Sequence, residues 1–321
     1  MKLLLVLLIL ICAFSSPASL AQDRATSTGQ TRRQQPIVYG DWNVVVNTDL
    51  VTLNVTVADA NGNHIEGLNK NAFAVYDNHA RQEITFFGDT DEPVSVAIVF
   101  DVSGSMSEGK IARAKQALRL FIQTSHVDDE FYLITFNSEA SLVLEKTRDA
   151  DAVANKLTYI QPHGNTALYD AVLLGLEKVM RGTHPRHVLL IISDGEDNNS
   201  RYSFNEIRQR LRESDAIIYA VGINESFLPR KGVVDGRVVL QELASATGGK
   251  AFSPNSQSGM NDAFERIALE LRHLYSISFR PENFVGDGKW RRLKVKVSPP
   301  PGFPHLFVRS RDGYYTVMRP R

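Results

Sequence analysis

Hydrophobic and polar residues follow two different patterns along the chain, one near its ends and the other in its middle. In residues 43–58, apolar side chains such as Val51, Leu53 and Val55 occupy alternate positions. A period of two is typical of strands with one buried face, so this stretch predicts strands. Similar short strands are predicted at 73–77, 83–87, 275–279, 292–297 and 314–318.

The middle of the chain consists of continuous apolar runs that alternate with helical patterns. The run Ser95–Phe100 is apolar after its first residue, as expected of a strand that is covered on both faces. After this run, Ile111, Ala114 and Leu118 repeat at the spacing of one helical face. These patterns predict an α/β fold, a doubly wound, mostly parallel sheet with helices on both faces. Further strands are predicted at 131–136, 187–192 and 216–221, and helices at 110–126, 167–180, 203–212, 240–247 and 261–274.

The α/β segment is flanked by strand patterns on both sides, which predicts that it is an insertion. We expect the N-terminal and C-terminal strands to meet in one small β-sandwich. The predicted parts are an N-terminal β unit over 37–92, the α/β domain over 93–278, and a C-terminal β segment over 279–321 that packs with the N-terminal unit.

The first residues have the features of an export signal. Lys2 is followed by the apolar stretch Leu3–Phe14, and small residues then lead to Ala21. The apolar stretch is about 12 residues long, short of the roughly 20 that a spanning helix needs. We therefore expect a signal peptide over 1–21, a disordered tether over 22–36, and an exported protein, periplasmic or secreted, without a transmembrane anchor in the mature chain.

The balance of charged residues argues against nucleic acid and acidic lipid as partners. Lys and Arg together number 36, as do Asp and Glu, so the formal net charge is zero. A chain without net charge has no long-range field that would attract nucleic acid or acidic lipid. Cys12 is the only cysteine and lies in the predicted signal peptide, so the mature protein would have to rely on its core rather than on disulfides.

Oxygen-bearing side chains follow the first buried strand of the α/β segment. Asp101, Ser103 and Ser105 come directly after Phe100 at alternate positions. The spacing lets the three side chains point to one side of a turn, with Gly104 easing the backbone. A carboxylate and two hydroxyls are hard ligands, which suit Mg²⁺ or Mn²⁺.

Two later loops are expected to reach the same place. Asp194 lies just beyond a second buried strand, and Thr166 lies just before a helix. In open α/β sheets, ligands bind beyond the carboxyl ends of the strands, where such loops converge. Asp and Ser also serve as helix caps and turn formers. The arrival of all three segments at the appropriate loops favours a metal site over caps alone.

The three segments resemble the metal-ion-dependent adhesion site of von Willebrand factor type A domains. The resemblance rests on Asp101-Val-Ser-Gly-Ser-Met106, Gly164-Asn-Thr-Ala-Leu-Tyr-Asp170 and Ile192-Ser-Asp-Gly195, and it spans roughly 93–278. It implies a von Willebrand factor A, Rossmann-like fold. It also implies that Asp101, Ser103, Ser105, Thr166 and Asp194 are the metal ligands. More narrowly, the chain is similar to exported bacterial von Willebrand factor A-related proteins, which implies adhesion or assembly through a metal rather than turnover.

Two other functions remain open alongside this one. The favoured function is a protein-binding module in which the cation is completed by an Asp or Glu carboxylate of a partner. A metal-dependent hydrolase is the alternative, and its general base would have to be Asp170, Glu196 or His163. A metal-free scaffold that acts through its β-sandwich is the third hypothesis. The sequence does not indicate an oligomeric state.

Overall fold

The computed structural model describes residues 50–106, 108–223, 235–282, 285–299 and 305–316. The predicted signal peptide, the tether and the beginning of the strand pattern at 43–58 lie outside these residues. Within the described ranges, no helix is both long enough and apolar enough to cross a membrane.

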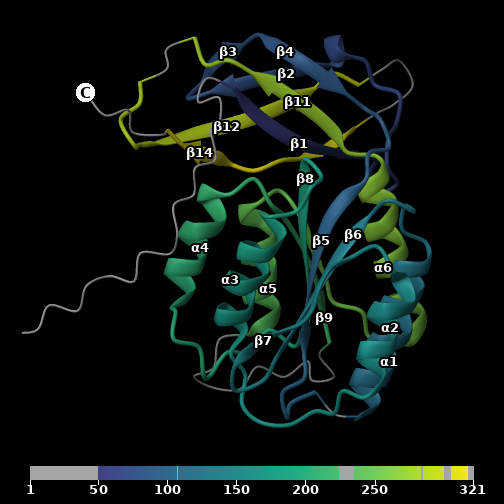
Figure 1. The fold of residues 1–321 in the computed structure, drawn as a ribbon. Coiled ribbons are helices and arrows are strands. Elements are labelled where there is room, and N and C mark those ends of the chain that lie inside the picture. The colour runs from purple at the N-terminus through teal and green to yellow at the C-terminus, as the bar shows by residue number, and fades with distance from the viewer. Residues whose placement is uncertain (1–49, 107, 224–234, 283–284, 300–304, 317–321) are drawn as a thin grey trace, which may run out of the picture. The chain divides into compact units, whose positions relative to one another are not determined.

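A six-stranded sheet lies at the centre of the α/β part of the molecule (Figure 1). All eight residues of its strand β5 (Val94–Asp101) are buried, because helices cover both of its faces. The order is β10-β9-β8-β5-β6-β7, and every pair is parallel except β6 with β7 at the edge. The other strands are β6 (Glu130–Phe136), β7 (Ala140–Thr147), β8 (Arg186–Ser193), β9 (Ile217–Gly222) and β10 (Lys250–Phe252).

Helices cover this sheet on both sides, three on each face (Figure 1). One core lies under α1, α2 and α6, with Phe121 and Phe264 in ring contact at 6.0 Å between centroids. A second core lies under α3, α4 and α5. The predicted α/β fold class is confirmed. The helices are α1 (Glu108–Gln123), α2 (Ala150–Thr158), α3 (Leu168–Val179), α4 (Phe204–Glu213), α5 (Gly236–Ala246) and α6 (Gln257–Arg272).

Two four-stranded antiparallel sheets form the second part of the described chain, and they enclose a third core. Alternate residues of β1 (Val51–Ala58), such as Leu53 and Val55, point into this core. The first sheet has the order β13-β1-β11-β4, and the second has the order β14-β12-β2-β3. The remaining strands are β2 (Phe73–Asp77), β3 (Ala80–Gln82), β4 (Ile84–Gly88), β11 (Tyr275–Phe279), β12 (Trp290–Val297), β13 (Phe307–Arg309) and β14 (Gly313–Tyr315).

The sandwich is built from strands that precede and follow the α/β segment, as the sequence predicts. Leu53 of β1 pairs with Ile277 of β11, and Val75 of β2 pairs with Val295 of β12. The whole α/β segment is therefore inserted between β4 and β11, which are hydrogen-bonded neighbours. The boundary expected at residue 278 falls inside β11, a strand of the sandwich.

A buried arginine ties the inserted segment to the sandwich. Arg186, the first residue of β8, is 2% exposed. Its Nη2 donates to the carbonyl oxygens of Thr90 and Leu274, each at 3.1 Å. Its Nε lies 3.5 Å from a carboxylate oxygen of Glu92. Thr90 and Glu92 belong to the link between β4 and β5, and Leu274 belongs to the link between α6 and β11. One side chain therefore contacts both of the links that connect the inserted segment to the sandwich.

Replacing Arg186 with Met should lower the free energy of unfolding by about 2–4 kcal/mol, because buried carbonyl groups and a carboxylate lose their donor. Urea denaturation followed by circular dichroism measures this change. Arg148→Met is the control, since Arg148 pairs with Asp128 through side chains that are 56% and 53% exposed. That variant should change stability by less than about 0.5 kcal/mol. Equal losses in the two variants would contradict the role given to Arg186.

Candidate metal centre

The centre begins with a carboxylate at the end of the central strand. Asp101 is the last residue of β5 and is completely buried. Its Oδ1 accepts hydrogen bonds from the backbone N–H of Ser103 at 2.9 Å and from the Ser103 hydroxyl at 2.5 Å. Its Oδ2 accepts from the Ser193 hydroxyl at 2.6 Å. An Asp that accepts from the backbone two residues later forms an Asx turn, so the strand ends in a tight loop whose polar groups face the carboxylate.

The same loop brings two hydroxyls together. The Oγ atoms of Ser103 and Ser105 are 3.0 Å apart; Ser103 is buried, while Ser105 is exposed to solvent. Between them, the N–H of Gly104 donates to the carbonyl oxygen of Gly164 at 2.9 Å. A Cβ on Gly104 would lie only 3.2 Å from that oxygen, so glycine permits the close approach of the first loop to the second.

The second loop carries Thr166, which is 2% exposed and lies two residues before α3. The N–H of Thr166 donates to the side-chain oxygen of Asn198 at 2.9 Å. The Thr166 carbonyl oxygen in turn accepts from the N–H groups of Asn198 at 2.9 Å and Asn199 at 3.0 Å. These bonds join the second loop to the third, which follows β8.

The third loop presents Asp194, which is 3% exposed. Its Oδ1 accepts from the N–H of Glu196 at 3.2 Å, a second turn of the Asx kind. The next residue, Gly195, has a φ of +80°, which favours glycine, and a Cβ there would lie 2.2 Å from the carbonyl oxygen of Gly236. The start of α5 therefore packs directly on the loop that holds Asp194.

Hydrogen bonds thus bring together the three loops on which the sequence places its five candidate ligands. Asp101, Ser103 and Ser105 are linked side chain to side chain. Asp194 is close enough for its charge to act on Asp101. The second loop, which carries Thr166, is joined to the first loop by the backbone bond between Gly104 and Gly164. It is joined to the third loop by the bond from the Thr166 N–H to the side chain of Asn198.

Electrostatics at this junction disfavour negative charge on Asp101. Burial raises the pKa of Asp101 from its ordinary value of 3.8 to about 6. The hydrogen bonds from Ser103 and Ser193 oppose this shift, while the neighbouring charge of Asp194 adds to it. A bound cation would offset the cost of burying the Asp101 charge and its repulsion by Asp194. The donor set therefore fits a hard divalent ion.

Hydroxyl oxygens are the other side-chain ligands that the three joined loops offer to such a set. Within the described ranges, no three His, Cys, Asp or Glu side chains form a group that could hold a metal ion. Asp101 and Asp194 supply only two acidic groups, and Ser103, Ser105 and Thr166 are the hydroxyl residues on the joined loops. The chemistry of the set is therefore that of an oxygen site, which suits Mg²⁺ or Mn²⁺ better than softer metals.

Two of the three residues considered as general bases, Asp170 and His163, take part in holding the loops. Asp170, in the first turn of α3, accepts from the N–H of Arg201 at 2.9 Å and from its Nε at 2.8 Å. It thereby anchors the third loop to the helix. The N–H of His163 donates to the carbonyl oxygen of Val102 at 2.9 Å, and its Nε2 lies 2.9 Å from Nδ2 of Asn137.

Two residues that support the centre were not singled out from the sequence. Ser193 donates to Asp101 and accepts from the N–H of Gly195 at 2.9 Å, so it connects the first and third loops. The sequence feature that could have indicated Ser193 is a hydroxyl residue directly after the apolar run Val188–Ile192. Asn198 orients the second loop, but its partner Thr166 is 32 residues away, and a lone Asn in a polar loop gives no signal of this contact.

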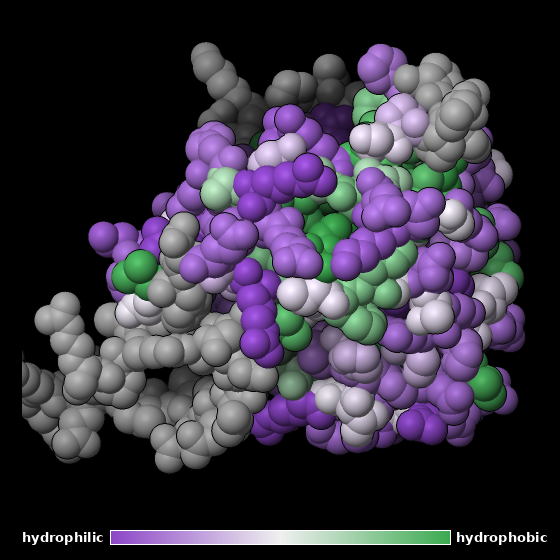
Figure 2. Space-filling model, turned by 90° about the horizontal axis from the view of Figure 1, so that it is seen from above, coloured by the Kyte–Doolittle hydropathy of each residue, from purple (hydrophilic) through white to green (hydrophobic). Residues whose placement is uncertain are grey.

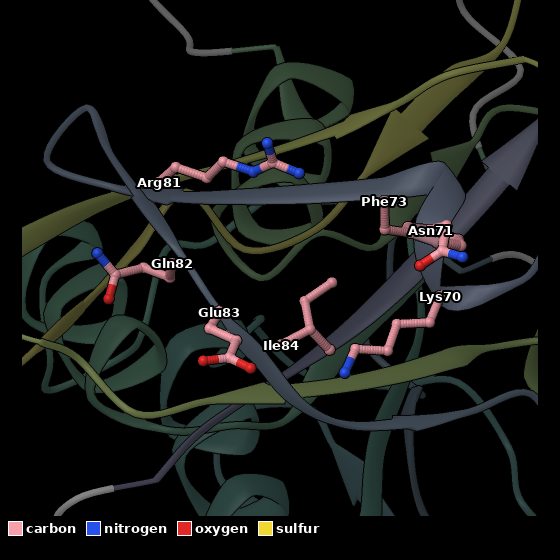
Figure 3. Close-up of a pocket in the computed structure, with 7 residues that line it drawn as sticks. All are labelled: Lys70, Asn71, Phe73, Arg81, Gln82, Glu83 and Ile84. Carbon is pink, nitrogen blue, oxygen red and sulfur yellow. The ribbon is translucent and has the colours of Figure 1, made fainter.

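A separate concavity lies in the sandwich (Figure 3). Its volume is about 520 Å³, within the range of small-ligand pockets. Figure 3 shows Lys70 and Asn71 on one side and Gln82 and Glu83 on the other. Phe73, Arg81 and Ile84 complete the lining.

Comparison with known proteins gives the same family for sequence and fold. The family model "von Willebrand factor type A domain" matches residues 95–266, which is more than half of the chain. Calcium-activated chloride channel regulator 1 of Homo sapiens is 31% identical over 228 residues, covering 66% of this chain and 23% of that protein. Inter alpha-trypsin inhibitor, heavy chain 4, of Mus musculus is 26% identical over 226 residues, covering 61% and 24%. The chain thus matches about a quarter of each relative's length.

A solved structure supports the similarity of fold. The von Willebrand factor type A protein from Catenulispora acidiphila superposes with a TM-score of 0.50 at 12% identity, covering 84% of this chain and 74% of that one.

The raised pKa of Asp101 predicts a pH dependence of stability in the presence of chelator. A carboxyl group whose folded-state pKa is raised stabilises the fold while protonated, and this contribution is lost as the pH rises from about 4 through about 6. Between about pH 4.5 and pH 8, Asp101 should cost the wild type about 2 kcal/mol of unfolding free energy. Asp101→Asn should lack this component, so its stability relative to wild type should rise with pH. Urea titrations at both pH values measure the difference; parallel pH profiles for the two proteins would contradict it.

Proposed function

The chain belongs to the von Willebrand factor type A domain family, and we propose that it is an exported protein-binding module. In this proposal Asp101, Ser103, Ser105, Thr166 and Asp194 hold a divalent cation, Mg²⁺ or Mn²⁺, that an acidic group of a protein partner completes. The observation that carries the proposal is the junction of three loops around a completely buried carboxylate, Asp101, beside a second acid, Asp194.

The residues of the chain have distinct tasks in this proposal. Ser103 and Ser193 fix the orientation of the Asp101 carboxylate by donating to its two oxygens. Asn198 fixes the second loop, which bears Thr166. Ser105 is exposed, so the centre opens to solvent at this side, where a partner can approach. A bound divalent ion would supply the positive charge that attracts a partner's carboxylate.

The contacts of Asp170 and His163, two of the three candidate general bases, favour binding over turnover. A hydrolase would need a general base aimed at a reacting water. The Asp170 carboxylate accepts two hydrogen bonds from Arg201, and both ring nitrogens of His163 lie near Asn137 or the carbonyl oxygen of Gln161. We therefore propose that the protein is not an enzyme.

Export is part of the proposal and rests on the sequence of residues 1–21. An exported module of this kind would act in the periplasm or outside the cell. Adhesion or assembly at the envelope is the corresponding role.

Metal binding should depend on the two acids of the centre. We expect Mg²⁺ or Mn²⁺ to raise the melting temperature of the wild type, because an ion that binds only the folded state stabilises it, by about 2.7 kcal/mol at a hundredfold excess over Kd. Asp101→Asn and Asp194→Asn should abolish this rise. Asp149→Asn is the matched control, since Asp149 caps α2 and Asn is an equally good cap. Calorimetric titration gives the affinities; equal ion binding by all four proteins would refute the assignment.

Partner binding should require both the ion and an acid. We expect wild type, but not Asp194→Asn, to retain envelope proteins in the presence of Mg²⁺ and to release them on addition of chelator. A retained partner should lose binding when a single surface Asp or Glu at its contact site is replaced by Asn or Gln. Retention that chelator leaves unchanged would contradict a metal bridge.

A further inference from the structure

One sheet of the sandwich concentrates positive charge in a chain with a formal net charge of zero. The four strands β14, β12, β2 and β3 contain five Lys and Arg residues and a single carboxylate. That carboxylate, Asp77, is 8% exposed and accepts from the hydroxyl of Tyr314 at 2.8 Å. The sheet therefore offers solvent a cationic surface that its own strands do not neutralise.

The register of the strands places four of these cations on the outer face. In β12, Leu293 and Val295 point into the sandwich core, and the residues that alternate with them are exposed. Lys294 pairs across the sheet with Tyr76, and Tyr76 pairs with the exposed Arg81. The outer basic face is defined by Arg81, Arg292, Lys294 and Lys296.

The cations of this face have no acidic partner within the described ranges, in contrast to their neighbours. Lys289 and Arg291 both lie near the carboxylate of Asp287, at 3.5 and 3.1 Å. For the four residues of the outer basic face, no Asp or Glu oxygen of the described chain lies within the 4 Å of an ion pair. Lys296 instead places its Nζ over the ring of Tyr76, 5.1 Å from the centroid. Since these four side chains form no ion pair within the described residues, their charges are available to an anionic partner.

The sandwich surface seen from above is mostly polar. Figure 2 looks down on the sandwich and shows hydrophilic side chains over most of the described surface, with a smaller apolar area between them. The large apolar residues that are exposed in the described chain, such as Phe86 of β4 and Phe307 of β13, lie outside the four strands of the basic sheet. A membrane surface usually gains from apolar anchors as well as cations, so the absence of such anchors from these four strands favours a polar, acidic partner.

The spacing of the cations fits an extended chain. Alternate residues of a strand are about 6.6–6.8 Å apart, which separates Arg292, Lys294 and Lys296 by equal steps. An acidic peptide in extended conformation places every second side chain at the same interval. We propose that the outer basic face binds an extended segment of a partner protein in which Asp or Glu occupies every second position. This site is distinct from the candidate metal centre.

Fluorescence anisotropy with the full chain and a labelled peptide tests the proposal. The probe alternates Glu and Thr, and the matched peptide has the same composition with its Glu residues grouped together. We expect tighter binding of the alternating peptide, weakening with salt. Lys294→Glu/Lys296→Glu should weaken that binding about tenfold or more, since two attractive pairs become repulsive. Chelator should leave the binding unchanged.

The control is a double variant with the same change of charge elsewhere. Arg119 on α1 and Lys156 on α2 are exposed, and Arg119→Glu/Lys156→Glu should leave peptide binding within about twofold of wild type. If the first double variant fails to fold, Lys294→Gln/Lys296→Gln removes both charges without introducing negative ones and should still weaken binding.

Three results would overturn the proposal. Equal loss in the control variant would show an effect of net charge alone. Equal affinity for the two peptides would remove the argument from spacing. Tighter, Lys294-dependent binding to vesicles of anionic phospholipid than to the alternating peptide would assign the face to a membrane.

Discussion

The buried carboxylate of Asp101 is the interaction on which the candidate centre depends. It ends β5, the strand that pairs with both β6 and β8 in the middle of the sheet, and its two oxygens receive hydrogen bonds from two different loops. A carboxylate in this position is costly unless its lone pairs are satisfied and its charge is balanced. The hydroxyls of Ser103 and Ser193 meet the first condition. The need to balance the charge of Asp101 explains why a cation fits the place where the loops meet.

The sequence allows the fold to be predicted because its strongest signals are long and uniform. The short apolar runs of β5 and β8 are typical of strands covered on both faces, and the period-two pattern of β1 and β12 is typical of strands with one face on a core. Weaker elements were missed for physical reasons. Edge strand β7 has partly exposed residues on both faces, and α2 has only nine residues. Short or half-exposed elements have little periodicity to detect.

The candidate ligands stay a prediction, and the sequence signals them more clearly than it signals the residues around them. The five candidate ligands stand directly after strands or before a helix, where the sequence gives a local signal. Ser193 and Asn198 act through partners 92 and 32 residues away, and only the fold brings those pairs together. The outer basic face was hidden for the same reason. The neutral net charge is an average over the chain, whereas Arg81 meets the β12 lysines only through the register of strands from opposite ends of the sequence.

The pairing of β4 with β11 has a consequence for how such a molecule can be assembled. Gly88 at the end of β4 lies opposite Ser276 at the start of β11, and the two strands run antiparallel. If the residues between them were replaced by a tight turn, these strands would form an ordinary hairpin and the sandwich could close without the rest. The α/β layer is therefore set between two strands that are direct neighbours, so the insertion leaves the β4–β11 pairing of the sheet intact.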